Sequence, residues 1–328
     1  MSTAAGLAAG ALIDAAVGDP QRWHPVAGFG RLATALERRM WRPSRPAGAA
    51  YTAACVGGAV LAIRAFAGRR LSRRRTLVTA AATWAVIGAR TLGAEALRID
   101  AALAGGDLER ARQLLPRLCG RDPAGLGADE IARATIESVA ENTSDAVVAP
   151  LLWGAVAGPA GLAGYRAVNT LDAMVGHRSA RYERFGWASA RVDDAANAGP
   201  ARLTALLTAA CAPLVGGSPR AAWRVARADG RKHPSPNAGW CEAAYAGALG
   251  VRLGGRNVYG DRVEDRPVLG SSGRPPAQGD IARAVRLERA VSAAATGLAV
   301  LTAAGLARRS RRRDRASEQR ARSERLWP

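Results

Sequence analysis

The stretch that decides the fold is IESVAENTSDAVVAPLLWGAVAGPAGLAGYRAVNTLDAMVGHR, residues 136–178. Glu137, Glu141 and Asp145 stand four residues apart, so on a helix they share one face. An uncharged run at 146–164 follows and is long enough to enter a membrane. Carboxylates next to a segment long enough to enter the bilayer cost free energy unless they are paired or bound to a cation. This stretch therefore predicts a functional site in a membrane protein.

Further uncharged runs at 47–63, 76–89, 203–217 and 290–307 indicate more helices of this kind. No stretch alternates apolar and polar residues over a strand's length, and 255–278, rich in Gly, Pro and charge, is expected to be an exposed loop. We therefore predict an all-α, multi-pass integral membrane protein in which residues 1–307 form one membrane-embedded helical domain. Buried helices of a large soluble protein are the alternative explanation of the same runs.

Positive charge is concentrated beside the uncharged runs. The formal net charge is +20, and Lys232 is the one lysine among the 47 basic residues. The blocks RRLSRRR at 69–75 and RRSRRR at 308–313 suit contact with anionic lipid headgroups, so we expect location in the cell membrane. Residues 308–328 are expected to be a basic, disordered tail. No nucleic-acid-binding motif accompanies the charge, which argues against a nucleic-acid partner.

Two polar motifs follow the apolar core of the chain. ARVDDAANAGPARL at 190–203 supplies Asp193, Asp194 and Asn197, and KHPSPNAGW at 232–240 supplies Lys232, Ser235 and Asn237. The first could extend a cation site, because Mg²⁺ binds one or two carboxylates together with substrate phosphate oxygens. The second is a turn rich in hydrogen-bond donors, which suits a phosphate or carboxylate ligand. A solvated helix face and a plain surface turn are the structural alternatives.

In their order, these motifs resemble one family. GDPQRWHPVAGFG (18–30), GRDPAGL (120–126), residues 136–178, YERFGWASARVDDAANAGPARL (182–203) and HPSPNAGWCEAAYAGALGVRLGG (233–255) are similar to the CobD/CbiB family. The resemblance covers about residues 10–290. Cys241 stands where proline is expected, and Ala173 and His177 stand where Ser and Tyr are more usual, but no candidate carboxylate is lost.

The resemblance implies a membrane-embedded ligase of cobalamin (vitamin B12) biosynthesis, an adenosylcobinamide-phosphate synthase. Its substrates would be (R)-1-amino-2-propanol, or its O-phosphate, and the corrinoid adenosylcobyric acid, whose f-propionate carboxylate forms an amide with the amine. It further implies ATP and Mg²⁺ as cofactors, and a complex with other cobalamin-pathway proteins is possible. The sequence contains no GxxxxGK[ST] motif for the nucleotide.

The roles that follow are hypotheses. We assign catalysis to the six carboxylates, Mg²⁺ to three of them, and substrate or phosphate binding to polar residues around them. The catalytic set is Glu137, Glu141, Asp145, Asp172, Asp193 and Asp194; the metal set is Glu141, Asp145 and Asp172; the binding set is Asp19, His24, Asn142, Asn169, Asn197, Lys232, Ser235 and Asn237.

Two other functions would use similar residues. A Mg²⁺-dependent membrane transferase acting on a phosphorylated lipid would need repeated Asp-rich motifs, and the NxxD at Asn169–Asp172 is not part of such a repeat. A corrinoid transporter or membrane subunit would show inverted repeats, and no internal symmetry is visible.

Overall fold

The computed structural model describes residues 2–19, 24–68, 73–177, 179–259 and 262–324. The first half of the chain holds α1 (Ser2–Val17), α2 (Pro25–Met40), α3 (Arg45–Ala67), α4 (Arg73–Val86), α5 (Ala89–Ala104), α6 (Leu108–Leu114), η1 (Leu115–Arg117) and α7 (Ala128–Thr143). The second half holds η2 (Ser144–Val148), α8 (Ala149–Ala157), α9 (Pro159–Leu171), η3 (Asp172–Gly176), α10 (Trp187–Cys211), η4 (Ala212–Val215), α11 (Pro219–Asp229), α12 (Ala238–Leu249), β1 (Leu253–Tyr259), β2 (Arg262–Leu269) and α13 (Gln278–Glu324).

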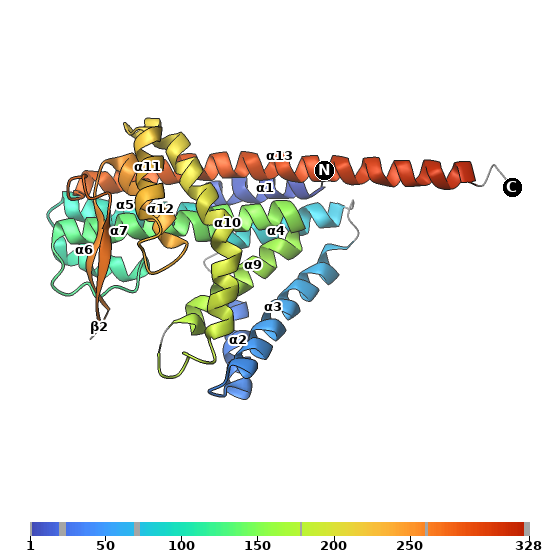
Figure 1. The fold of residues 1–328 in the computed structure, drawn as a ribbon, viewed down its shortest axis with the longest axis horizontal. Helices are drawn as coiled ribbons and strands as arrows, with labels where there is room; N and C mark the ends of the chain where they lie inside the picture. The colour runs from blue at the N-terminus through green and yellow to red at the C-terminus, as the bar shows by residue number, and fades with distance from the viewer. Residues whose placement is uncertain (1, 20–23, 69–72, 178, 260–261, 325–328) are drawn as a thin grey trace.

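The helical fold predicted from the sequence is confirmed. Among the described residues, four helical segments are long and apolar enough to cross a membrane: Arg45–Ala67, Arg73–Ala104, Trp187–Val215 and Gln278–Arg313. They contain the uncharged runs at 47–63, 76–89 and 290–307 and most of that at 203–217. Figure 1 shows α13 running along one edge of the molecule and past its end, while α2, α3 and part of α10 form an arm that projects from the body.

Helix α1 packs closely on α4 because two glycines of α1 face α4. A Cβ atom at Gly6 would lie 2.5 Å from Thr79 Cβ, and one at Gly10 would lie 2.4 Å from Thr83 Cβ. The two glycines are four residues apart, which is the spacing that lets helix backbones approach each other in membranes. The hydroxyls of Thr79 and Thr83 donate to carbonyls one turn back on α4, so this interface leaves neither hydroxyl unpaired.

The prediction that 146–164 is one membrane-length helix is wrong. The run is divided between α8 and α9 at Gly158, whose φ of +67° suits glycine, and Pro159 then begins α9. A Cβ at Gly161 would lie 2.1 Å from the Trp153 carbonyl oxygen, so α8 and α9 make a close helical corner. Apolar composition alone does not distinguish such a corner from a straight helix. The Gly-Pro pair is the local signal.

The expected loop at 255–278 is also corrected. β1 and β2 form an antiparallel hairpin in which Val258 pairs with Val263, with an irregular register between Leu253 and Gly255. Gly254 has a φ of +85° at this irregularity, and the Arg133 side chain donates to backbone carbonyls of Gly254 and Arg256. The hairpin therefore depends on contacts with α7. Arg133 and Gly254, which make one of these contacts, are 121 residues apart in the sequence.

The tail differs from the expectation as well. Residues 308–324 continue α13 as a helix instead of forming a disordered segment, and 325–328 lie outside the described residues. Neither Gly nor Pro occurs between Leu306 and Trp327, and Arg, Ala, Glu and Gln, which predominate there, are good helix formers. Helix propagation from an existing helix avoids the cost of nucleation, which explains why the pattern continues past the apolar part.

Candidate active site

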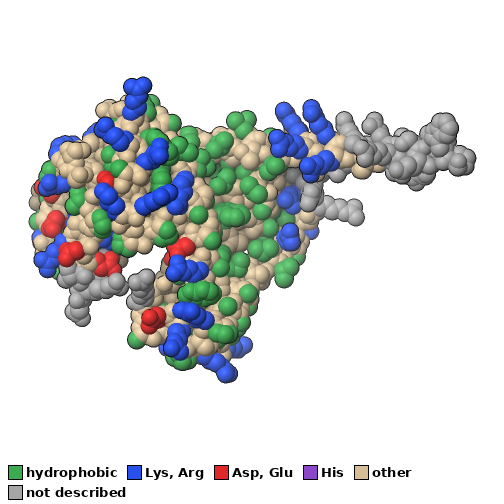
Figure 2. Space-filling model, in the orientation of Figure 1, with side chains coloured by type: hydrophobic (Ala, Val, Ile, Leu, Met, Phe, Trp, Pro, Cys, Tyr) green, Lys and Arg blue, Asp and Glu red, His purple; other side chains and the backbone are tan. Residues whose placement is uncertain are grey.

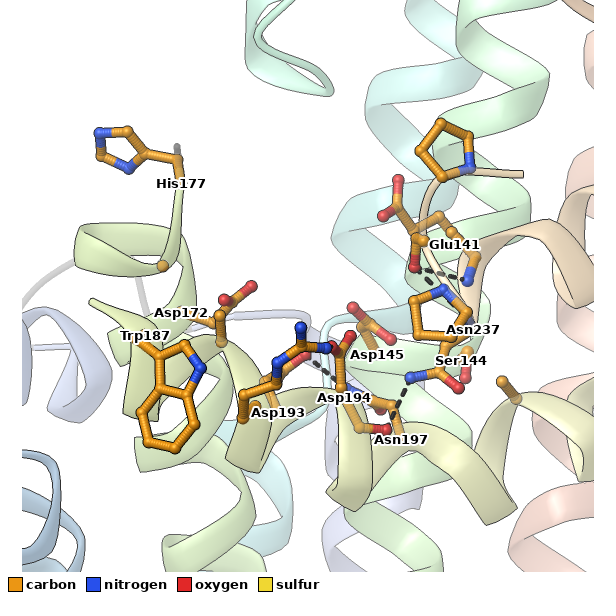
Figure 3. Close-up of a pocket in the computed structure, with 18 of the residues that line it drawn as sticks. Glu141, Ser144, Asp145, Asp172, His177, Trp187, Asp193, Asp194, Asn197 and Asn237 are labelled. Atoms are coloured by element: carbon orange, nitrogen blue, oxygen red, sulfur yellow. Dashed lines mark hydrogen bonds and ion pairs between the residues drawn. The ribbon is translucent and has the colours of Figure 1, made fainter. Parts of the chain in front are cut away.

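An acidic cavity of about 560 Å³ lies where η2, η3, α10 and the start of α12 meet the end of α7. Its lining includes the side chains of Glu141, Asp145, Asp172, Asp193 and Asp194. In Figure 3, Asp145, Asp172, Asp193 and Asp194 gather around the middle of the view, with Glu141 and Asn237 on one side and Trp187 and His177 on the other. The structure thus brings five of the six predicted catalytic carboxylates to one cavity.

Two of these carboxylates stand on π-helical turns. Asp145 belongs to η2, which joins α7 to α8, and Asp172 begins η3, which ends the helix continued from α9. Such turns are rare in proteins as a whole, and those that do occur are often found at functional sites. Gly176 leaves space for the Asp172 carboxylate, because a Cβ there would lie 1.9 Å from Asp172 Oδ1.

Helix α10 contributes Asp193, Asp194 and Asn197. The Asn197 amide donates to Asp193 Oδ2 at 2.9 Å and its oxygen accepts from the Tyr165 hydroxyl at 2.8 Å, which fixes the asparagine between α9 and α10. Asp193 Oδ1 is buried without a hydrogen-bond partner. Asp194 Oδ2 lies 3.4 Å from Arg191 Nη1. One carboxylate oxygen of a residue that lines the cavity is therefore buried without a hydrogen bond.

The cavity carries more negative than positive charge. Its described lining contains six carboxylates, the sixth being Glu183, and two arginines, Arg45 and Arg191. Neither Glu141 nor Asp172 makes a hydrogen bond or ion pair with any described residue. This excess would attract a cation, either a metal ion or the ammonium group of a substrate.

Burial and mutual repulsion shift the pKa values of these acids. Burial is the largest cause that raises the pKa of Asp172 to about 7, and the charges of Asp193, Asp194 and Glu141 add to it. Burial, then Glu141, Asp193 and Asp172, raises the pKa of Asp145 well above its ordinary value. Burial of the carboxyl group among protein atoms is the largest cause that raises the pKa of Glu141, although its side chain is exposed to the cavity.

The acidic oxygens suit magnesium chemically, since Mg²⁺ prefers hard oxygen ligands. Within the described ranges, no three His, Cys, Asp or Glu side chains form a ready-made metal cluster. A magnesium ion in this cavity would bind one or two carboxylates and take its other ligands from substrate and water, which is its usual coordination in proteins. Glu141, Asp145 and Asp172, the three residues assigned to Mg²⁺ from the sequence, all line the cavity.

A polar chain leads from the cavity into the protein. Asn169 Nδ2 donates to Asp145 Oδ2 at 3.4 Å, and Arg166 Nη1 donates to Asn169 Oδ1 at 3.3 Å. Arg166 Nε is buried without a partner. We did not single out Arg166 from the sequence, although its position three residues before Asn169 places both on one helical face.

The side of the cavity formed by the start of α12 suits an anion. Ser235 Oγ accepts from the backbone N–H groups of Asn237 and Ala238, and Asn237 Nδ2 donates to the Asp194 carbonyl at 2.8 Å. Arg202 Nη1 donates to Asn237 Oδ1 at 2.6 Å. These bonds hold the N-terminus of α12, the positive end of its dipole, against the cavity.

Several predicted residues lie elsewhere. Glu137 accepts from Arg121 at 2.5 Å, from Arg133 at 3.4 Å and from the Gly254 N–H at 2.7 Å, so it joins α7 to the hairpin rather than lining the cavity. Asn142 donates to Ser138 and Lys232 pairs with Asp229. His24 caps α2, and the Asp19 backbone N–H donates to Thr91. These side chains are absent from the described lining of the cavity.

Other lining residues were missed. Arg45, at the start of α3, stacks on Trp187, with its guanidinium carbon 5.3 Å from the ring centroid. Arg191 lies one turn from Asp194. Trp187 and Arg191 fall inside the motif at 182–203, but no spacing rule distinguishes them from ordinary surface residues.

Comparison with known proteins supports the same grouping of motifs. The family described as "CobD/Cbib protein" matches residues 7–288. The chain belongs to the CobD/CbiB family. The resemblance noted in the sequence is therefore confirmed, and it spans every element that contributes to the cavity.

Curated CobD relatives match over most of their length. "Cobalamin biosynthesis protein CobD" of Mycobacterium tuberculosis (strain ATCC 25618 / H37Rv) is 53% identical over 300 residues, which are 91% of this chain and 95% of the relative. The proteins of the same name from Geobacter metallireducens and Rhodobacter capsulatus are 47% and 43% identical, covering 80% and 87% of this chain and 85% and 92% of those relatives. No solved structure matches the chain.

Proposed function

We propose that this CobD/CbiB family member acts in cobalamin biosynthesis as an amide-forming ligase in the cell membrane. It would join (R)-1-amino-2-propanol, or its O-phosphate, to the f-propionate carboxylate of adenosylcobyric acid and so produce adenosylcobinamide or its phosphate. The observation that supports the proposal is the cavity in which five carboxylates lie beside the N-terminus of α12.

The acids would first bind the amine. An aminoalcohol enters as an ammonium ion, and the excess of carboxylates at the cavity attracts that charge. The ammonium must lose a proton before its nitrogen can attack a carboxyl carbon. Asp172, with its pKa raised to about 7 by burial and by neighbouring acids, can accept that proton near neutral pH.

The opposite side of the cavity would bind the negative group of the substrate. A phosphate on the aminoalcohol would lie near the N-terminus of α12, with Ser235 and Asn237 beside it, and Arg45 and Arg191 supply positive charge to the same cavity. An ammonium and a phosphate on one short molecule would then occupy opposite sides of the cavity. This arrangement would orient the nitrogen toward the incoming carboxyl group, and positioning of this kind accounts for much enzymatic rate enhancement.

ATP with Mg²⁺, when bound, would turn the carboxylate oxygen into a better leaving group. Glu141 and Asp145 would hold the cation, while the chain of Asn169 and Arg166 keeps Asp145 in place. Their negative charge would otherwise repel the substrate carboxylate. A cation bound by these two residues would therefore reduce the repulsion between their carboxylates and also let the corrinoid carboxylate approach.

The test is direct synthesis. Membranes containing the chain are incubated with adenosylcobyric acid, ATP, Mg²⁺ and either aminopropanol or its O-phosphate, and the amide is detected by mass. We expect product in one or both amine arms and none when ATP is omitted. Asp129→Asn, at an exposed position on α7 outside the cavity, is the matched control and should retain full activity. No product in any arm from the folded wild-type protein would refute the proposal.

A further inference from the structure

Residues 234–238 form one wall of the acidic cavity. Figure 2 shows a hollow in the surface between the body of the protein and the arm, with acidic and basic side chains at its edge. The lining of the cavity includes Arg45, which begins α3 in the arm, and Ala238, which begins α12 in the body. His233 directly precedes the wall but is absent from the described lining, so its effect on a ligand would pass through the turn at 234–238.

The imidazole ring of His233 holds this turn through Nδ1, which accepts a hydrogen bond from the backbone N–H of Ser235 at 3.0 Å. A backbone N–H can only donate, so Nδ1 carries no hydrogen. Burial, followed by the charge of Arg266, lowers the pKa of His233 to about 4, so the imidazole is neutral at neutral pH. Its single N–H is therefore on Nε2.

The other side of the ring is also held in place. Nε2 lies 3.6 Å from Oε1 of the buried Glu242, so the ring N–H faces a carboxyl oxygen. Arg266 Nη1, 3.3 Å from Nε2, is itself a donor and does not accept that hydrogen. A Cβ at Gly239 would lie 2.4 Å from His233 Cβ, so the first turn of α12 packs directly on the histidine. These contacts hold the ring in one orientation.

The turn, held in this way, leaves one hydrogen-bond donor for a ligand. Ser235 Oγ accepts from the backbone N–H groups of Asn237 at 3.3 Å and Ala238 at 3.1 Å. Ser235 lines the cavity, and its hydroxyl hydrogen is donated to no residue in the described part of the chain. A phosphate oxygen would suit this hydroxyl, because hydrogen bonds to an ionised acceptor are stronger than those between neutral groups.

We propose that His233 is a positioning residue for phosphate binding, whose Nδ1 holds Ser235 so that the serine hydroxyl donates to the phosphate of the amine substrate. This inference rests on the proposed function, since it takes the α12 side of the cavity as the phosphate site. His233 itself would touch neither the substrate nor a cation. The acceptor at the position of Nδ1 should therefore determine the affinity for phosphate, and the group at the position of Nε2 should not.

Two substitutions separate these positions in the full chain purified in detergent. In His233→Asn, the amide oxygen takes the place of Nδ1 and can accept from the N–H two residues on, as asparagine does in Asx-turns. In His233→Gln, the polar atoms lie at the place of Nε2. Calorimetric titration with aminopropanol phosphate gives the dissociation constant. We expect His233→Asn to bind within twofold of the wild type and His233→Gln to bind about tenfold more weakly, as for loss of one hydrogen bond to a charged group.

The difference between the two variants should be absent for aminopropanol, which has no phosphate. In amide synthesis, His233→Gln should raise the KM for aminopropanol phosphate and leave the KM for ATP within twofold of the wild type, and His233→Asn should restore the first value. A purely structural role of the histidine would not produce this separation. If His233→Gln does not fold, His233→Ala takes its place, with the same expected loss.

Ser218→Ala is the matched control, because it removes a hydrogen bond at the start of α11, outside the cavity. It should bind aminopropanol phosphate like the wild type. Equal affinities of His233→Asn and His233→Gln, or the same loss in Ser218→Ala, would overturn the proposal. A wild-type chain for which the binding series holds, but which makes no amide, would refute the proposed function and leave this inference standing.

Discussion

Replacing Asp172 by asparagine should stabilise the protein at alkaline pH while removing its activity. The carboxyl group has an ordinary pKa of 3.8, and burial raises the pKa to about 7 in the folded protein. The folded state therefore keeps a proton that the unfolded chain has already lost. Stability falls as the pH rises from about 4 to about 7, and above 7 the full cost of the buried charge is present.

The size of this cost follows from the shift. A difference of about 3.2 pKa units, from 3.8 to about 7, corresponds to about 4 kcal/mol at 1.36 kcal/mol per unit. Water in the cavity and sharing of charge with Asp193 and Asp194 reduce it, so we expect a gain of roughly 2 kcal/mol for Asp172→Asn at pH 8. At pH 5 most of that cost is absent, and the gain should fall below about 1 kcal/mol.

Thermal unfolding in detergent at pH 5 and pH 8 measures the effect. The melting temperature of Asp172→Asn should exceed that of the wild type by a few degrees at pH 8 and by much less at pH 5. Asp129→Asn, at an exposed position, controls for loss of a negative charge and should give no gain. A lower melting temperature for Asp172→Asn at pH 8, or an equal gain at both pH values, would refute the reasoning.

Three other substitutions follow from the geometry. Glu137→Gln should destabilise the protein by on the order of 3 kcal/mol at neutral pH, and so lower the melting temperature, because Arg121 would lose a buried ion-pair partner. Glu141→Gln should not lower the melting temperature, and equal losses in thermal melts of the two variants would contradict this division. Gly176→Ala should cost at least tenfold in amide synthesis with little loss of stability, since its Cβ would displace the aspartate of η3; a wild-type rate would count against that contact. Gly10→Leu should destabilise the protein by several kcal/mol in a denaturation assay, because the new side chain would meet α4; an unchanged melt would refute this packing.

The carboxylate spacing was informative because helical periodicity is local. Glu141 and Asp145 are one turn apart in the sequence, and both reach the cavity. Glu137 has the same spacing but a different environment, since Arg121 and Gly254, 16 and 117 residues away, come to it through tertiary packing. No local pattern predicts those partners.

The same limit explains the other differences. The run at 146–164 is apolar throughout, and its division at Gly158 depends on how Trp153 and Gly161 pack. Lys232 lies near Ser235 in the sequence, but Asp229 on the preceding turn binds it and the cavity does not contain it. Composition predicted which segments are apolar or acidic, and tertiary contacts determined which acids face the acidic cavity.

The central claim is that the carboxylates of the acidic cavity perform amide synthesis. The most direct measurement is the rate of product formation from adenosylcobyric acid and aminopropanol phosphate, with ATP and Mg²⁺, by membranes containing Glu141→Gln or Asp172→Asn at matched protein levels. We predict that each variant inserts normally and loses at least a hundredfold in rate, while Asp129→Asn matches the wild type. Wild-type rates in both cavity variants would contradict the account.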